Sequence, residues 1–153
     1  MESFMKFIPA ASDESVNNFA SYFIDVNDKL LAIDPNLCYQ WVTHEESSNV
    51  DPAEHIDEQT QEGALNLIAE VIRTSAEDPQ PPPDKERAEM LLQEIGEVLS
   101  QKYGQDLMMF NNPILAKGNK KKFCKIASDM YRQVLRKSEK DSSRILRYLL
   151  TQG

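Results

Sequence analysis

Apolar residues recur at steps of three and four along most of this chain, and that spacing constrains its fold more than any other feature. The first clear example is the row Val16, Phe19, Phe23, Val26 and Leu30. Such steps place side chains on one face of an α-helix, whereas a half-buried strand alternates apolar and polar residues. The pattern predicts an all-α protein, a compact bundle in which each helix buries one face.

Start and stop signals divide the pattern into about five helices, which are expected to begin near residues 12, 55, 84, 119 and 141. The first should end before Pro35, because the residue that precedes a proline is disfavoured in helical geometry. The third is capped by Asp84 and stops at Tyr103, since Gly104 suits the left-handed conformation that often follows a helix end. The second helix is expected to bury Ile56, Ala64, Leu65, Ile68, Val71 and Ile72.

Two stretches lie outside these helices and are predicted to be irregular, residues 37–52 and 105–118. Within the first, residues 37–43 are rich in the aromatic and β-branched types that favour strands. A lone strand would have nothing to pair with, so an irregular or helical segment that buries Tyr39 and Trp41 is favoured. Both alternatives remain open from the sequence alone.

Residues 76–83 hold four prolines and break the helical pattern most clearly. Each proline removes an amide donor and fixes a backbone torsion, so this segment is predicted to be a stiff connector between helices. It also contains a minimal PxxP motif at residues 79–82, of the kind that docks into aromatic grooves, but a connector explains the prolines without a partner. Residues 1–153 together have the length of one domain, and a single helical domain is expected.

The two cysteines, Cys38 and Cys124, have no second cysteine or histidine at a metal-ligand spacing. A disulfide between them is one alternative. Free cysteines that act as small buried apolar residues are favoured, with Cys124 beside Phe123 as the better example. No stretch has the features of a signal peptide or the length of a membrane helix, so a cytoplasmic protein without a membrane partner is expected.

No nucleophile motif and no glycine-rich phosphate loop occur, so the protein is predicted not to be an enzyme and to need no cofactor. The two histidines, His44 and His55, bracket an acidic segment and are candidates for metal ligands. Their spacing matches no ligand motif, and a solvated acidic loop is favoured over a metal site. A helical enzyme with a carboxylate and histidine metal site is the lesser alternative.

Charge is divided unequally along the chain, although the net charge is only −8. Residues 1–113 carry 6 Lys and Arg against 22 Asp and Glu, and residues 114–153 carry 11 against 3. The two parts therefore have opposite sign. The simplest explanation is that the basic helices dock on the acidic part of the same chain, or form an ordinary solvated surface.

A lysine cluster opens the fourth predicted helix, where the helix dipole favours anions rather than cations. Misplaced cations and free backbone amides at one point predict a site for a phosphate or carboxylate. The candidate anion-binding residues are Lys117, Asn119, Lys120, Lys121, Lys122, Lys125, Arg132 and Arg136. Nucleic acid or another polyanion is the implied ligand, with Lys137, Arg144 and Arg147 as extensions and Tyr131 and Tyr148 as stacking faces.

The acidic segment at residues 45–62 suits a different ligand, a basic protein that is captured by electrostatic steering. The candidate contacts are Glu45, Glu46, Glu54, Asp57, Glu58 and Glu62. An inhibitor, immunity protein or adaptor would work in this way. Because no catalytic motif competes with it, a non-catalytic protein-binding or regulatory module is the favoured function, and polyanion binding is the alternative.

Overall fold

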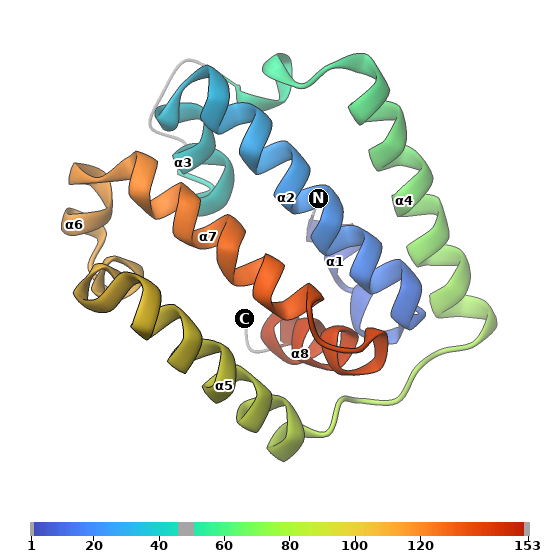
Figure 1. Ribbon diagram of the computed structural model, residues 1–153. Coiled ribbons are helices and arrows are strands. Elements are labelled where there is room, and N and C mark those ends of the chain that lie inside the picture. The colour runs from blue at the N-terminus through green and yellow to red at the C-terminus, as the bar shows by residue number, and fades with distance from the viewer. Residues whose placement is uncertain (1, 46–50, 152–153) are drawn as a thin grey trace.

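The computed structural model describes residues 2–45 and 51–151, and all regular structure in these residues is helical (Figure 1). The α-helices are α1 (Glu2–Met5), α2 (Asp13–Ile33), α3 (Pro35–Thr43), α4 (Glu58–Glu77), α5 (Lys85–Tyr103), α6 (Pro113–Gly118), α7 (Lys120–Leu135) and α8 (Glu139–Thr151). Short 3₁₀ helices are η1 (Ile8–Ala10), η2 (Pro52–His55) and η3 (Gly104–Asn111). The all-α prediction is confirmed, and its five helices correspond to α2, α4, α5, α7 and α8.

Local capping chemistry sets several of these boundaries. Asp84 lies before α5 and its side chain accepts a hydrogen bond from the Arg87 amide, as an N-cap residue does. Gly104 ends α5 with a φ of 56°, a backbone conformation that glycine adopts without steric cost. At the end of α2, Asp34 is extended because Pro35 follows it.

Residues 37–43 are helical, which is one of the two alternatives favoured for them, and residues 105–118 are largely helical where an irregular segment was predicted, so that prediction is wrong. Residues 46–50 of the first stretch lie outside the described residues. Pro35 is the first residue of α3, where Asp34 caps the helix, and Pro113 is the first residue of α6, where Asn112 caps it. A proline in the first turn loses no hydrogen bond, so each proline starts a helix as well as ending the segment before it. Residues 37–43 consequently lie in α3 rather than in a strand, with Tyr39 buried.

The long helix α2 runs through the middle of the molecule and contacts α3, α4, α7 and α8 (Figure 1). Helix α5 lies along one edge, where it packs against α8, α7 and η3. Helix α4 lies at the opposite edge and packs against α2 and η1. The proline connector between α4 and α5 is fastened at one point, where the Gln80 amide donates to the carbonyl of Ala10.

Buried apolar residues form two clusters along α2. The larger includes Val16, Ala20, Val71, Leu91, Ile95, Leu99, Val134, Ile145 and Leu146. The second includes Val26, Leu30, Leu37, Cys38, Tyr39, Phe123, Cys124 and Ile126. Tyr103 and Leu107 pack against both clusters, so the end of α5 and the start of η3 bridge them.

The expectation of free cysteines is wrong. Cys38 on α3 and Cys124 on α7 are fully buried and form a disulfide, with their Cα atoms 6.3 Å apart. The pairing follows from the packing of α3 against α7, which a sequence separation of 86 residues does not reveal. Closing a loop of that length stabilises a fold by roughly 4.6 kcal/mol, because it restricts the unfolded chain.

None of the helices within residues 2–45 and 51–151 has both the length and the apolar character to cross a membrane.

Candidate functional site

Five of the lysines singled out from the sequence surround one open hollow at the start of α7. The hollow measures roughly 500 Å³ and is lined by Pro35, Lys117, Gly118, Asn119, Lys120, Lys121, Lys122 and Lys125. We call these residues the basic corner. It lies where α6 leads into α7, at the end of α7 near α3 (Figure 1). Packing of α6 and α3 against α7 thus turns a run of lysines into a concave, positively charged surface.

Three of these lysines have partners at the rim of the hollow. Lys117 pairs with Glu45 at 2.8 Å, and Lys122 pairs with Asp106 at 3.1 Å. Lys120 donates to the Asn36 side chain at 2.7 Å and lies 5.3 Å from the centre of the Tyr39 ring. The hydrogen bond to Glu45 raises the pKa of Lys117, so that lysine keeps its charge at neutral pH. Exposed pairs of this kind contribute little to stability and compete weakly with an external anion.

Lys121 and Lys125 differ from the other three. Neither has a hydrogen bond or an ion pair with any residue in the described part of the chain. Asn119 occupies the N-cap position of α7, but its side chain accepts no capping hydrogen bond and donates instead to the Leu115 carbonyl at 3.0 Å. The start of α7 therefore combines two cations that have no partner among residues 2–45 and 51–151 with first-turn amides that no side chain caps.

The arginines predicted to extend this surface lie elsewhere. Arg132 pairs with Asp28 on α2, and Arg136 follows the last turn of α7, about 24 Å along the helix from its start. The other candidates form internal ion pairs, namely Lys137 with Glu94, Arg144 with Asp141 and Arg147 with Asp13. The structure thus brings the five lysines together and separates them from the arginines.

The two tyrosines considered as stacking faces are also engaged within the fold. Tyr131 packs against Phe23, with ring centroids 4.6 Å apart, and burial raises the pKa of its hydroxyl. The hydroxyl of Tyr148 donates to Glu89 at 2.8 Å. A row of free aromatic rings beside the lysines is therefore not formed by these residues.

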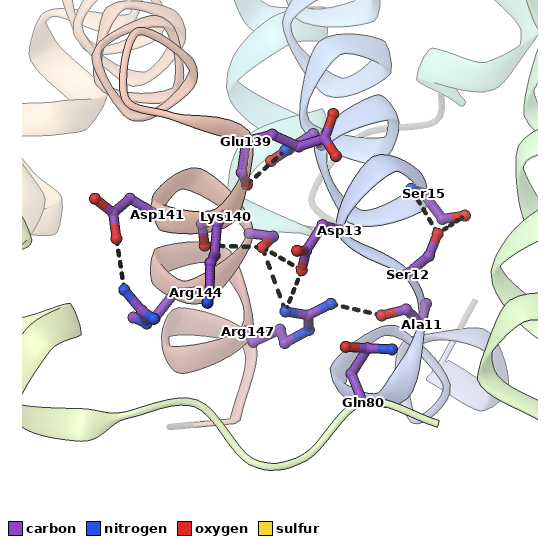
Figure 2. Close-up of polar contacts among 12 residues, drawn as sticks. Ala11, Ser12, Asp13, Ser15, Gln80, Glu139, Lys140, Asp141, Arg144 and Arg147 are labelled. Atoms are coloured by element: carbon purple, nitrogen blue, oxygen red, sulfur yellow. Dashed lines mark hydrogen bonds and ion pairs between the residues drawn. The ribbon is translucent and has the colours of Figure 1, made fainter. Parts of the chain in front are cut away.

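A second charged cluster, centred on Arg147, fastens α8 to the start of α2 (Figure 2). Arg147 is 6% exposed and donates to Asp13 at 2.7 Å and to the Ala11 carbonyl at 2.6 Å, while the Ser143 hydroxyl donates to Asp13 at 2.6 Å. Burial raises the pKa of Asp13, but the hydrogen bonds from Ser143 and Arg147 outweigh it, and the net shift is downward. These polar atoms are directed at one another, which is typical of a structural ion pair rather than of a binding site.

The acidic candidates are divided between the two ends of the segment. Glu45 faces the basic corner through Lys117, and Glu46 lies outside the described residues. Asp57 caps α4 and pairs with Lys29 at 3.2 Å, and its hydrogen bonds from the amide and hydroxyl of Thr60 lower its pKa to about 2. The remaining three candidates, Glu54, Glu58 and Glu62, are exposed.

The prediction that α4 buries Leu65 and Ile72 is wrong, since Leu65 is 68% exposed and Ile72 is 41% exposed. Helix α4 packs on one side only, with Val71 as its one buried residue. Its opposite side carries a row of exposed residues, Leu65, Ala69, Ile72 and Ala76, which we call the α4 stripe. The apolar spacing of the sequence contained this row, but only the position of α4 at the edge shows which apolar residues face outward.

The two histidines do not belong to a metal cluster in the described residues. His44 ends α3 with a φ of 54°, and His55 ends η2. No group of three or more His, Cys, Asp and Glu side chains within residues 2–45 and 51–151 is placed to hold a metal ion.

No family model, curated protein or solved structure matches this chain.

Proposed function

We propose that this protein is a non-catalytic binding module and that the α4 stripe, with the carboxylates beside it, receives a basic protein partner. The observation that supports it is the row of four exposed apolar residues at steps of four, three and four. This is the spacing of the seam between two packed helices. An exposed apolar row on a helix is a frequent mark of a protein contact.

Carboxylates define the character of the partner. Glu58 and Glu62 continue the row toward the start of α4, and neither pairs with a cation in the described part of the chain. Glu70 and Glu77 lie farther round α4 and both pair with Arg73, which is the charged residue next to the stripe. The matching surface is an amphipathic helix with apolar residues along one face and Lys or Arg at the end that meets Glu58 and Glu62.

Affinity capture with the wild-type chain and with a Leu65→Arg, Ile72→Arg double variant tests this proposal. Met90, which is 45% exposed on α5, provides the control variant Met90→Arg. A protein that is bound by wild type and by the control, but lost by the double variant, supports the α4 stripe as the contact. Equal capture by all three contradicts it. Self-association that the double variant abolishes would make a second copy the occupant instead.

A second candidate function, binding of an anion at the basic corner, is favoured by the five lysines around one hollow. Inorganic polyphosphate is a suitable probe because it carries phosphate charge without bases or lipid. Titration calorimetry is expected to show binding that a Lys121→Ala, Lys125→Ala double variant weakens. Since neither lysine has a partner in the described residues, this variant should fold normally. An unchanged affinity would contradict the placement.

The cellular location is a separate question. The sequence predicts the cytoplasm, whereas a buried disulfide is more typical of proteins that mature in an oxidising compartment. Acid quenching of intact cells, followed by alkylation under denaturing conditions and mass spectrometry, distinguishes them, because unfolding exposes both buried cysteines. Alkylated Cys38 and Cys124 would support the cytoplasm, and an intact disulfide would support the oxidising compartment.

A further inference from the structure

The basic corner continues directly into exposed apolar side chains on η3 and α6. Ile114 is 82% exposed, Met108 59%, Leu115 42% and Phe110 41%. We call these four residues the apolar tip. Four large apolar side chains exposed within eight consecutive residues exceed the scattered exposure that is ordinary on a protein surface.

The apolar tip is held in place by neighbours that are themselves buried or paired. Met109, between Met108 and Phe110, and Ala116, directly after Leu115, are buried in the second core cluster. The Phe110 ring contacts the Phe123 ring of α7, with centroids 4.9 Å apart. Asn112 caps α6 by accepting from the amides of Ile114 and Leu115. The exposure of the tip is therefore a consequence of a fixed local structure.

Contacts between neighbouring residues hold η3 and α6, which carry the tip, against the start of α7, which carries the lysines. The Asn119 side chain donates to the Leu115 carbonyl, and Lys122 pairs with Asp106 of η3. Lys117 follows Leu115 by two residues in the same short helix. Exposed apolar side chains and the lysines of the basic corner thus lie at one corner of the molecule.

We propose that the basic corner and the apolar tip together dock on the surface of an anionic lipid bilayer. The lysines contact lipid phosphates, and the four apolar side chains enter the boundary between headgroups and acyl chains. This is contact with one leaflet by a folded surface and involves no membrane-spanning helix. The proposal rests on the second candidate function, since it names the source of the anion that the lysines bind.

The composition of the corner favours lipid over nucleic acid. Lysines account for the phosphate contacts of either ligand, but a nucleic acid leaves Ile114 without an apolar partner. The two tyrosines considered for base stacking are occupied, since Tyr131 packs on Phe23 and Tyr148 is bonded to Glu89. A bilayer satisfies the aliphatic side chains and the cations at the same time.

The acidic helix α4 lies on the side of the molecule that would face away from the membrane. Helix α4, with Glu58, Glu62, Glu70 and Glu77, lies at the edge of the molecule opposite α6 (Figure 1). A molecule that approaches an anionic surface with α6 keeps these carboxylates away from it. The unequal distribution of charge then orients the protein on the membrane before any apolar side chain inserts.

Vesicle flotation tests the proposal with the full chain. Neutral phosphatidylcholine vesicles are compared with vesicles in which roughly a third of the lipid is phosphatidylglycerol, at low and near-physiological ionic strength. We expect binding to the anionic vesicles only. The Lys121→Ala, Lys125→Ala variant should lose about 25-fold in affinity, which is about fivefold for each lysine. An Ile114→Ser, Leu115→Ser variant should lose at least about tenfold, because its inserted apolar area is removed.

Matched controls lie on α5, away from the corner. Lys85, whose side chain is 69% exposed, is changed to Ala, and Val98, which is 45% exposed, is changed to Ser. Both control variants should bind vesicles as wild type does. Circular dichroism of each variant verifies that its helices are formed.

The contrary outcomes separate this proposal from the one on which it rests. Binding to anionic vesicles and to polyphosphate that needs the lysines but ignores Ile114→Ser, Leu115→Ser leaves an anion site and overturns lipid docking. Polyphosphate binding without vesicle binding does the same. Absence of both overturns the anion site and the docking together. Self-association that the Ile114→Ser, Leu115→Ser variant abolishes would assign the apolar tip to a second copy and overturn lipid docking.

Discussion

The α4 stripe and the apolar tip both expose apolar side chains next to charged residues, yet they differ in regularity. The α4 stripe follows the repeat of a long helix and lies beside carboxylates. The apolar tip comes from two short elements with no repeat and lies beside lysines. A regular row suits a partner with the same repeat, such as another helix, whereas an irregular tip suits a fluid surface that needs no register. Two exposed apolar surfaces on one protein can therefore suit different kinds of partner.

The first prediction concerns the Arg147 cluster, which lies apart from both surfaces and holds α8 against the start of α2. Replacing Arg147 with Ala leaves the Asp13 carboxylate partly buried without its cation, and we expect the free energy of unfolding to fall by about 3 kcal/mol. Urea denaturation measures the change. Arg132→Ala, which removes an exposed pair with Asp28, should cost less than about 1 kcal/mol. Similar losses in the two variants would show that the Arg147 cluster has no special role.

The second prediction tests whether the two surfaces are independent. Leu65→Arg, Ile72→Arg should lower affinity for the protein partner by about a hundredfold while leaving vesicle binding unchanged. Lys121→Ala, Lys125→Ala should do the reverse. The distance between α4 and α6 in Figure 1 is the reason, since changes at well-separated sites are usually additive. A variant that affects both ligands would mean that the surfaces are coupled.

The third prediction compares how salt changes the binding of vesicles at the basic corner and of a protein partner at the α4 stripe. Raising the ionic strength from about 50 to about 200 mM should weaken vesicle binding roughly tenfold, because the contact relies on exposed lysines. Partner binding at the α4 stripe should change less, since apolar contact carries more of it. Flotation and capture measured at both salt concentrations give the comparison. Equal salt dependence would remove the distinction between them.

The smallest expected effect concerns the start of α4. Hydrogen bonds from Thr60 lower the pKa of Asp57 to about 2, below its ordinary value. A lowered folded-state pKa means that ionised Asp57 stabilises the helix start above the unfolded pKa, and that this contribution is lost as the pH falls toward 2. Carboxyl NMR should show an Asp57 midpoint near pH 2, and Thr60→Val should raise it. A midpoint near 4 in the wild-type protein would contradict the cap.

The comparison also shows which features a single sequence can predict. Helix ends at Asp84 and Gly104 depend on neighbouring residues, so their chemistry was legible in the chain itself. The predicted helix end before Pro35 is confirmed, but the helices that start at Pro35 and Pro113 were not predicted, because a proline also begins a helix when a capping residue precedes it. In both cases the deciding residues are neighbours in the sequence. A helix end at Asp84 or Gly104 depends on one residue, whereas a helix that starts at a proline also needs the capping residue before it.

Features that depend on the packing of distant residues are harder to predict from the sequence. The lysines of the basic corner were found because they are close in sequence, whereas the ion pairs of Arg132 and Arg147 join residues more than a hundred positions apart. Leu65 and Ile72 belong to an apolar pattern that predicts a buried helix face, although both are exposed. The pattern does not show that α4 packs against the rest of the protein on one side only. The Cys38–Cys124 disulfide likewise required the contact between α3 and α7.

That disulfide has a consequence for the covalent topology of the chain. The proline connector at residues 79–83 lies between Cys38 and Cys124, so a cut there opens a ring instead of releasing a fragment. The acidic α4 and the basic α7 would stay on one molecule after such a cleavage and separate only when a reductant is added. Nicked protein would therefore migrate as one species on a non-reducing gel and as two on a reducing one.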